Sequence, residues 1–255
     1  MKNTLLKAIK EAGKIASEGF SKEKKFEYKG SIDLVTEYDL ACEKKIIEII
    51  KKKFPEHDIL TEETKQKDLH SEYKWIIDPI DGTTNFFHGH PFYCVSIGVE
   101  YKKEIIMGAV YAPYLNELFF AEKNKGAYLN NKLIKVSQIK TLKASLLSTG
   151  FPYDIATSKD NNINYFLAFV KEVQAIRRDG AAALDLCYVA CGRFDGFWEL
   201  KLHPWDMAAG SLIVKEAGGR ISNFNTEELD IYTRDVIAAN VFIYDEMKKI
   251  IMARG

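Results

Sequence analysis

The 255-residue sequence predicts an α+β protein whose second half has α/β character. Three observations support this. Amphipathic helical stretches come first, short strand-like segments follow over residues 75–137, and strand-like and helix-like segments alternate after about residue 140. Such alternation is typical of a mixed or parallel sheet. We therefore expect an N-terminal unit of helices and antiparallel sheet over residues 1–140 and an α/β unit over residues 141–255.

Apolar residues recur at helical spacing over residues 4–20 and again from about Asp39 to Lys53. The second helix should end at Phe54-Pro55, because proline disfavours helical backbone in the residue before it. The segment "SKEKKFEYKGSIDLVTEYD" between the helices is rich in lysine and predicts a loop or loose hairpin.

The strand-like segments are rich in β-branched and aromatic residues and are separated by turn signals. They read "KWIID", "YCVSIGVEY", "EIIMGAVY", "ELFFAE", "GAYLN" and "LIKVS". Asn130-Asn131 is a plausible hairpin turn between the last two. A largely antiparallel sheet is therefore expected over residues 75–137.

The α/β half begins after "SLLSTG". We expect a helix over about residues 160–172, then a strand in "QAIRR" and a helix in "AALDLCYVAC". A strand in "FDGFWEL", a helix in "WDMAAGSLIVKEAG", a strand in "VIAAN" and a final helix complete the chain.

Charge and cysteine content limit the classes of function. Lys+Arg and Asp+Glu each total 36, so the formal net charge is +0, which argues against nucleic-acid binding by bulk charge. Cys187 and Cys191 lie one helical turn apart in an apolar pattern, which predicts buried free thiols. The sequence shows neither a signal peptide nor a long uncharged apolar run, so we expect no membrane partner and a cytoplasmic location.

The stretch "WIIDPIDGTTNFFHG" places Asp78 and Asp81 three residues apart, where a buried strand meets a turn. Asp-Gly is itself a strong turn dipeptide, so Asp81 alone has an ordinary structural explanation. Asp78 is harder to explain, because it is expected to close a buried strand and precedes Pro79. The end of a strand feeding a turn is a usual place for functional side chains.

Other acids have local explanations when each is considered alone. Asp206 in "HPWDMAAG" would offset a helix dipole, and Asp39 would be a helix N-cap. Glu62 and Glu63 in "ILTEET" would be surface charges.

Taken together, these acids at the edges of separate elements change the interpretation. Hard divalent cations such as Mg²⁺ prefer oxygen ligands and are usually held by a few carboxylates plus substrate phosphate oxygens. Next to Asp81, "DGTTN" offers backbone N–H groups at an incipient helix N-terminus, which could hold a phosphate. Metal ligands beside phosphate donors indicate a metal-assisted phosphoryl hydrolase.

Two long motifs resemble the signatures of the inositol monophosphatase family. "WIIDPIDGTTNFFHGHPFYCVSIG" resembles the first signature and "HPWDMAAGSLIVKEAGG" the second. "RRDGAAALDLCYVACGRFDGFWEL" is similar to bacterial members, and "DLVTEYD" and "TEET" fall where the family has acidic segments. The resemblance runs from about residue 5 to residue 245.

The resemblance implies a layered αβαβα sandwich shared with fructose-1,6-bisphosphatase-like proteins. It also implies hydrolysis of small phosphomonoesters with two or three Mg²⁺ per active site, lithium sensitivity and, commonly, a homodimer. Metal-activated water would attack phosphorus in line, and a second metal would stabilise the leaving alkoxide.

Residue roles follow from the resemblance alone. Its implied metal ligands are Glu62, Asp78, the Ile80 carbonyl, Asp81 and Asp206. Its implied catalytic residues are Glu62 and Thr83, which act on the attacking water, and Asp39, which supports Thr83. Its implied substrate contacts are Asp81, the amides of Gly82 and Thr83, Arg177, Gly180, Ala181, Ala182, Glu199 and Asp206.

The substrate stays open at this point. The family favours inositol 1-phosphate, but the segment after "TEET" is short and "STGFPYD" is similar to prokaryotic members, some of which also hydrolyse fructose 1,6-bisphosphate. Nucleotide 3′,5′-bisphosphate phosphatases share the implied ligands. A further alternative is a transcription-complex binding protein, since one bacterial relative joins RNA polymerase antitermination complexes. For the two adjacent arginines, Arg177 is preferred over Arg178 as the substrate contact.

Overall fold

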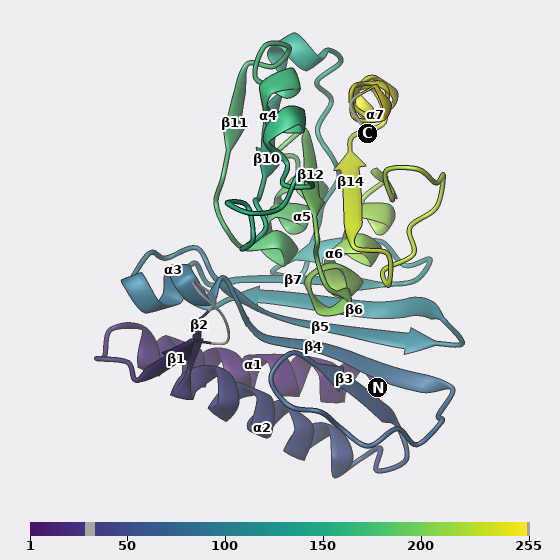
Figure 1. Ribbon diagram of the computed structural model, residues 1–255. Coiled ribbons are helices and arrows are strands. Elements are labelled where there is room, and N and C mark those ends of the chain that lie inside the picture. Colours follow the sequence, from purple (N-terminus) through teal and green to yellow (C-terminus); the bar gives the residue numbers. More distant parts are fainter. Residues whose placement is uncertain (29–33, 254–255) are drawn as a thin grey trace.

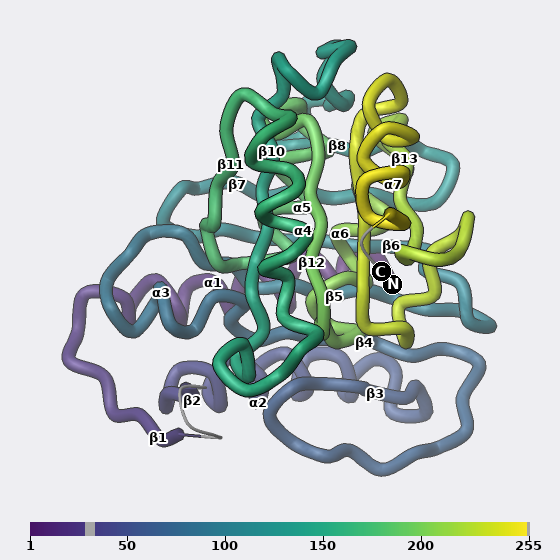
Figure 2. The backbone as a smooth tube through the Cα atoms, turned by 45° about the horizontal axis from the view of Figure 1, so that its top comes forward, coloured from purple at the N-terminus to yellow at the C-terminus, as the bar shows by residue number. Residues whose placement is uncertain are grey.

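The computed structural model describes residues 1–28 and 34–253 and shows a layered αβαβα sandwich (Figure 1). Helices α1 and α2 cover one face of a seven-stranded sheet, and α5 and α6 lie between that sheet and a five-stranded sheet. Helices α4 and α7 cover the outer face of the second sheet. The strands of the two sheets cross at a steep angle (Figure 2).

The helices carry most of the packing between layers. Their bounds are α1 Lys2–Phe20, α2 Glu37–Lys51, α3 Thr83–His88, α4 Ile163–Phe169, α5 Ala182–Ala190, α6 Pro204–Glu216 and α7 Tyr244–Met252, with a 3₁₀ turn at Leu142–Ala144. The expected helix over residues 160–172 is thus shorter than predicted.

The seven-stranded sheet has the order β3-β4-β5-β6-β7-β8-β9. Its strands are β3 Asp58–Thr61, β4 Tyr73–Asp81, β5 Cys94–Tyr101, β6 Glu104–Ala112, β7 Glu117–Glu122, β8 Ala127–Leu129 and β9 Lys132–Leu133. All neighbours are antiparallel except β3 and β4, which are parallel. The predicted hairpin turn is confirmed, because Asn130 and Asn131 connect β8 to β9 with φ of 48° and 65°.

The five-stranded sheet has the order β11-β10-β12-β14-β13. Its strands are β10 Leu146–Thr149, β11 Ala175–Arg177, β12 Gly196–Leu200, β13 Arg220–Ser222 and β14 Asp235–Ala239. The sequence did not predict β3, β10 or β13, each of which has only three or four residues. The division of the chain at residue 140 stays a prediction.

The segment between the first two helices contains the two-stranded hairpin β1 Phe26–Tyr28 and β2 Leu34–Thr36, which pair antiparallel. This matches the expected loose hairpin. Residues 29–33, which include the first residue of "DLVTEYD", lie outside the described residues.

Two local expectations were wrong. Thr36, not Asp39, is the N-cap of α2: the Thr36 hydroxyl accepts from Tyr38 N, and Asp39 at the third helical position accepts from Thr36 N at 2.9 Å. Asp78 does not close its strand, since β4 continues to Asp81 through a bulge in its pairing with β5, where Pro79 is tolerated.

Helix α6 is buried between the sheets because its residues are small where it meets β5 and β6. A Cβ added to Gly108 would lie 2.8 Å from the Ala209 backbone. This close approach carries the N-terminus of α6 to the edge of the first sheet.

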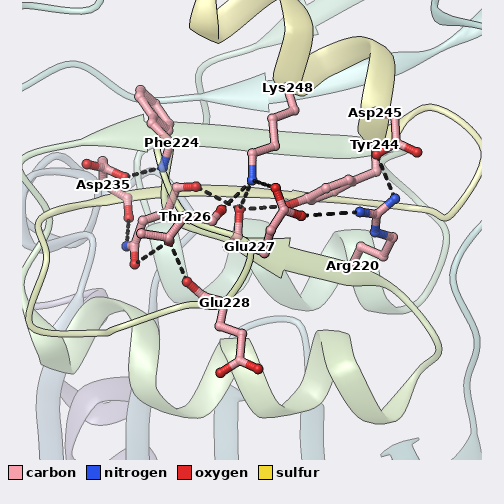
Figure 3. A network of polar contacts seen from close by, with 11 residues as sticks. Arg220, Phe224, Thr226, Glu227, Glu228, Asp235, Tyr244, Asp245 and Lys248 are labelled. Carbon is pink, nitrogen blue, oxygen red and sulfur yellow. Dashed lines mark hydrogen bonds and ion pairs between the residues drawn. The ribbon is translucent and has the colours of Figure 1, made fainter.

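Polar contacts fix the segment between β13 and β14 against α7 (Figure 3). Lys248 donates to the Thr226 carbonyl and to Glu227, and Asp235 accepts from Phe224 N at 2.6 Å. The segment therefore leads in a defined conformation to Arg234, beside the cavity described next.

Candidate active site

A cavity of about 550 Å³ lies where the end of β4, the start of α3 and the N-termini of α5 and α6 meet. Of the residues implied by the resemblance, those that line it are Glu62, Asp78, Ile80, Asp81, Gly82, Thr83, Gly180, Ala182, Glu199 and Asp206. The residues that do not line it are Asp39, Arg177 and Ala181. The structure thus brings together acids from separate segments of the chain.

Glu62 follows β3 directly, and the parallel register pairs Thr61 with Ile77 on β4. Extending this register by one residue sets Glu62 beside Asp78. The turn that holds Glu62 is tied to α2 by buried Glu43, which accepts from Thr61 Oγ1 at 2.6 Å and from Glu63 N at 3.0 Å. Glu63 is not among the cavity residues, so the geometry favours Glu62 of the pair.

The bulged end of β4 places Asp78, Ile80 and Asp81 in the cavity wall. Gly82 is the N-cap of α3 with φ of 87°, a left-handed conformation that glycine adopts without strain. No side chain within the described residues caps this helix. Its first N–H groups are therefore not taken by a capping side chain.

Thr83 is held by two acceptors. Its Oγ1 lies 3.0 Å from Asp39 Oδ1 and 2.9 Å from the Ile80 carbonyl, and the side chains of Thr83 and Asp39 are buried. Because the hydroxyl donates its proton to these acceptors, its lone pairs stay available to accept a hydrogen bond.

Asp206 enters the cavity from the first turn of α6, where it also forms a capping box. Its Oδ2 accepts from His203 N at 2.7 Å, so one oxygen is used to start the helix. The ring of His203 stacks on Trp205, which also lines the cavity.

Burial and neighbouring acids raise the pKa of Asp78, Asp81 and Asp206. Burial, then Glu62, Asp81 and Asp206, hold the pKa of Asp78 well above its ordinary value. Burial raises the pKa of Asp81 to about 7, although hydrogen bonds from Ala183 N and the Cys94 thiol oppose the shift. Burial and Asp81 also raise the pKa of Asp206. A cation bound here would relieve this repulsion.

The donor set fits a hard divalent cation. Asp78 Oδ1 is buried and accepts no hydrogen bond from any described residue, which is costly unless a cation or donor reaches it. Over residues 1–28 and 34–253, no three His, Cys, Asp or Glu side chains converge closely enough to hold an ion by themselves. An ion would therefore need further oxygen ligands, such as the Ile80 carbonyl, water or phosphate, as is usual for Mg²⁺.

The opposite wall carries Glu199 and Arg178. Burial and Asp81 raise the pKa of Glu199 to about 8, and Arg178 opposes this shift. The carboxyl of Glu199 lies against Gly150, where a Cβ would be 2.0 Å from Glu199 Oε1. Arg178 lines the cavity, whereas Arg177 is exposed and donates to the Ile176 carbonyl, so the geometry favours the arginine that the sequence interpretation did not prefer.

The sequence interpretation also missed two cationic residues of the cavity wall. Lys201 Nζ pairs with Asp154 Oδ2 at 2.7 Å, and Arg234 Nη2 donates to the Lys201 carbonyl at 3.0 Å. Phe151 and Tyr153 of the stretch "STGFPYD" also line the cavity. No local motif marks Lys201 and Arg234, because they come from segments that only the folded chain brings together.

The four cysteines are free, as predicted for Cys187 and Cys191. Cys187 is buried, but Cys191 is only partly buried, so the expected burial is wrong for Cys191. None of the described helices has the length and apolar character needed to cross a membrane.

Comparisons with known proteins give matches over nearly the whole chain. Residues 1–254 match the model of the Inositol monophosphatase family. The Inositol-1-monophosphatase of Synechocystis sp. is 46% identical over 222 residues, or 87% of this chain and 77% of the relative. The Nus factor SuhB of Haemophilus influenzae is 40% identical over 252 residues, or 97% and 94%.

Similarity extends to solved structures. The crystal structure of the extragenic suppressor protein suhB from Bartonella henselae superposes with a TM-score of 0.92 at 37% identity, covering 98% of this chain and 97% of that one. The chain belongs to the inositol monophosphatase family.

Proposed function

We propose that this protein is a Mg²⁺-dependent phosphomonoesterase whose substrate is inositol 1-phosphate. The family supports phosphatase activity, and its members are generally metal-dependent. The observation that carries the proposal is the convergence of Glu62, Asp78, Asp81 and Asp206 on one cavity next to the N-terminus of α3. Repelling acids beside amide donors suit a phosphate ester and its cation.

In this proposal, Mg²⁺ would be held by Glu62, Asp78, the Ile80 carbonyl, Asp81 and Asp206. The chemistry that bound Mg²⁺ supplies in such sites is stabilisation of phosphoryl charge and acidification of water. Asp78 suits the role of a ligand, because its Oδ1 is a buried acceptor without a donor among the described residues.

The chain's own groups orient the reaction. The Thr83 hydroxyl, held by Asp39 and the Ile80 carbonyl, would accept a hydrogen bond from the attacking water and aim it at phosphorus. Glu62 would take the proton of that water. The amides of Gly82 and Thr83 would hold the phosphate oxygens, since no described side chain caps α3.

The organic part of the substrate would face Gly180, Ala182 and Glu199. Ala181 would act through packing, because it is buried outside the cavity wall. We assign the cationic contact to Arg178 in place of Arg177, since Arg178 lines the cavity.

The experiment that tests this proposal is release of inorganic phosphate from inositol 1-phosphate by metal-depleted protein, before and after addition of Mg²⁺. Phosphate release that requires Mg²⁺ supports the proposal. No phosphate release when Mg²⁺ and inositol 1-phosphate are both present contradicts it. Inhibition by Li⁺ and a homodimer by light scattering are further parts of the proposal.

A second candidate is fructose-1,6-bisphosphatase activity in the same site. Arg178, Lys201 and Arg234 line the cavity and could approach a second phosphate, although Lys201 is already paired with Asp154. Comparing kcat/KM for inositol 1-phosphate, fructose 1,6-bisphosphate and an adenosine 3′,5′-bisphosphate separates these substrates.

A further candidate is a partner role in transcription, which the name of the Haemophilus influenzae relative raises. Recovery of transcription factors with the protein, together with no phosphatase turnover, would favour it over the enzyme.

A further inference from the structure

Two turns from distant parts of the chain meet beside the cavity. The first turn joins the end of β4 to the start of α3 and comprises residues 81–85, and the second leads into the start of α5 and comprises residues 179–183. Asp81 Oδ2 accepts from Ala183 N at 2.7 Å, and Asn85 Nδ2 donates to the Asp179 carbonyl at 2.7 Å. The first turn therefore holds the second at both of its ends.

Between these two hydrogen bonds the backbones are nearly in contact. A Cβ added to Gly82 would lie 3.1 Å from Ala181 Cβ and 3.2 Å from the Gly180 carbonyl oxygen. A Cβ added to Gly180 would lie 3.3 Å from Asn85 Nδ2. Both glycines have left-handed backbones, with φ of 87° and 84°. The spacing of the two turns is thus set by direct contact.

The amide of Asn85 is fixed by a second bond. Asn85 Nδ2 also donates to the Phe92 carbonyl at 2.7 Å, so both of its hydrogens are used. The Phe92 ring packs edge-on against Tyr188 of α5, with ring centroids 5.4 Å apart. Asn85 therefore links three segments that surround the phosphate end of the cavity.

We propose that Asn85 is a positioning residue, which sets the distance between the phosphate-binding turn and the wall that faces the organic part of the substrate. The inference rests on the proposed function, because that function assigns phosphate to Gly82 and Thr83 and the organic group to Gly180 and Ala182. Asn85 is not part of the cavity wall formed by the described residues. Replacing Asn85 leaves the reacting groups in place and allows the wall formed by Gly180 and Ala182 to shift.

The test compares Asn85→Asp and Asn85→Ala with the wild type. Aspartate keeps the shape but turns an oxygen toward two carbonyl oxygens, and alanine removes the contacts without adding charge. For both variants, KM for inositol 1-phosphate should rise about tenfold, which is the equivalent of one hydrogen bond lost between the shifted wall and the substrate. The kcat of both variants should stay within about twofold of the wild-type value. KM for 4-nitrophenyl phosphate, which has no polyol, should change less than about twofold.

Asn130→Asp is the matched control, because Asn130 also bonds a backbone carbonyl, that of Asn116 at 2.8 Å, but lies in the β8–β9 hairpin. It should leave both KM values unchanged. Binding of Mg²⁺ alone, measured by calorimetry, should be the same in Asn85→Ala and the wild type. Equal loss of activity toward both esters would overturn the proposal, as would wild-type KM values in both Asn85 variants.

Hydrogen exchange provides a readout that needs no turnover. Amides of residues 180–183 should exchange at least about tenfold faster in both Asn85 variants than in the wild type and the Asn130 control. Unchanged exchange there would refute the positioning role. If the wild type hydrolyses neither ester, the proposed function fails, and the exchange rates still decide whether Asn85 holds the turn.

Discussion

Replacing Gly150 with alanine should disable Glu199 without unfolding the protein. The new methyl group would lie 2.0 Å from Glu199 Oε1 and 2.4 Å from Oε2, whereas ordinary contacts begin at 3.4 Å. The carboxyl must therefore move by more than about 1 Å, a displacement that can cost up to about a hundredfold in rate. Gly150 is not left-handed, so alanine itself causes no backbone strain.

The fold should tolerate this change because the displaced atoms are the end of a flexible side chain. We expect a stability loss of less than about 2 kcal/mol. Loss of one hydrogen bond from Glu199 to a substrate hydroxyl, about 1–3 kcal/mol, lowers kcat/KM for inositol 1-phosphate by about 10- to 100-fold. The assay is phosphate release under initial-rate conditions, with melting temperature measured on the same samples.

A double-mutant cycle shows whether the effect passes through Glu199. In a Glu199→Ala background the clash has no partner, so adding Gly150→Ala should change kcat/KM by less than about twofold. Wild-type kcat/KM in Gly150→Ala alone would refute the reasoning. Additive losses in the double variant would show that residue 150 acts by another route.

Three further outcomes are expected. In metal-free protein the free energy of unfolding should fall as pH rises from about 4 to about 8, because Asp81 loses its proton near its ordinary pKa in the unfolded state, whereas burial raises its pKa to about 7 in the folded state. Urea titrations at several pH values should show that the free energy of unfolding depends less steeply on pH in Asp81→Asn than in the wild type, and equal steepness would contradict this. Asp81→Asn and Asp206→Asn should each lower kcat by at least about a hundredfold and raise the Mg²⁺ concentration needed for half-maximal rate, while circular dichroism shows an intact fold. Near-wild-type turnover in either variant would show that the replaced residue is not a metal ligand. Thr83→Ala should lower kcat by about 10²- to 10⁴-fold and Thr83→Ser should restore much of it, because serine keeps the hydroxyl that Asp39 and Ile80 orient; equal rates in both variants would exclude a role for that hydroxyl.

Long periodic segments made most of the fold predictable from the sequence. The two N-terminal helices, strands β4 to β7 and helices α5 and α6 have apolar patterns that match the faces they bury. The short strand β8 was predicted from its composition and the turn signals around it. Strands β3, β10 and β13 were missed; each has three or four residues and depends on its neighbours for pairing.

The site was predictable where its residues lie within a motif. Asp78, Ile80, Asp81 and Gly82 are consecutive or nearly so, and a strand-to-turn transition marks them. Arg178 was not distinguishable from Arg177, because adjacent residues on a strand point to opposite sides and the sequence does not say which side faces the cavity.

Supporting residues were least predictable. Glu43 looks like any charged residue of an amphipathic helix, yet it is buried and holds the turn that carries Glu62. Asn85 looks like an ordinary polar residue of a turn until its partners at Asp179 and Phe92 are known. These roles depend on contacts between segments far apart in the chain, which no local pattern encodes.

The most direct test of the proposed active site is a Mg²⁺ titration of phosphate release from inositol 1-phosphate, using metal-depleted wild type and Asp78→Asn. The wild type should be inactive without Mg²⁺ and gain activity as Mg²⁺ is added. Asp78→Asn should stay at least about a hundredfold slower at saturating Mg²⁺, because asparagine lacks the negative charge and one of the two oxygens of the buried Asp78 carboxylate. Turnover without Mg²⁺, or equal turnover by the two proteins, would contradict the proposed site.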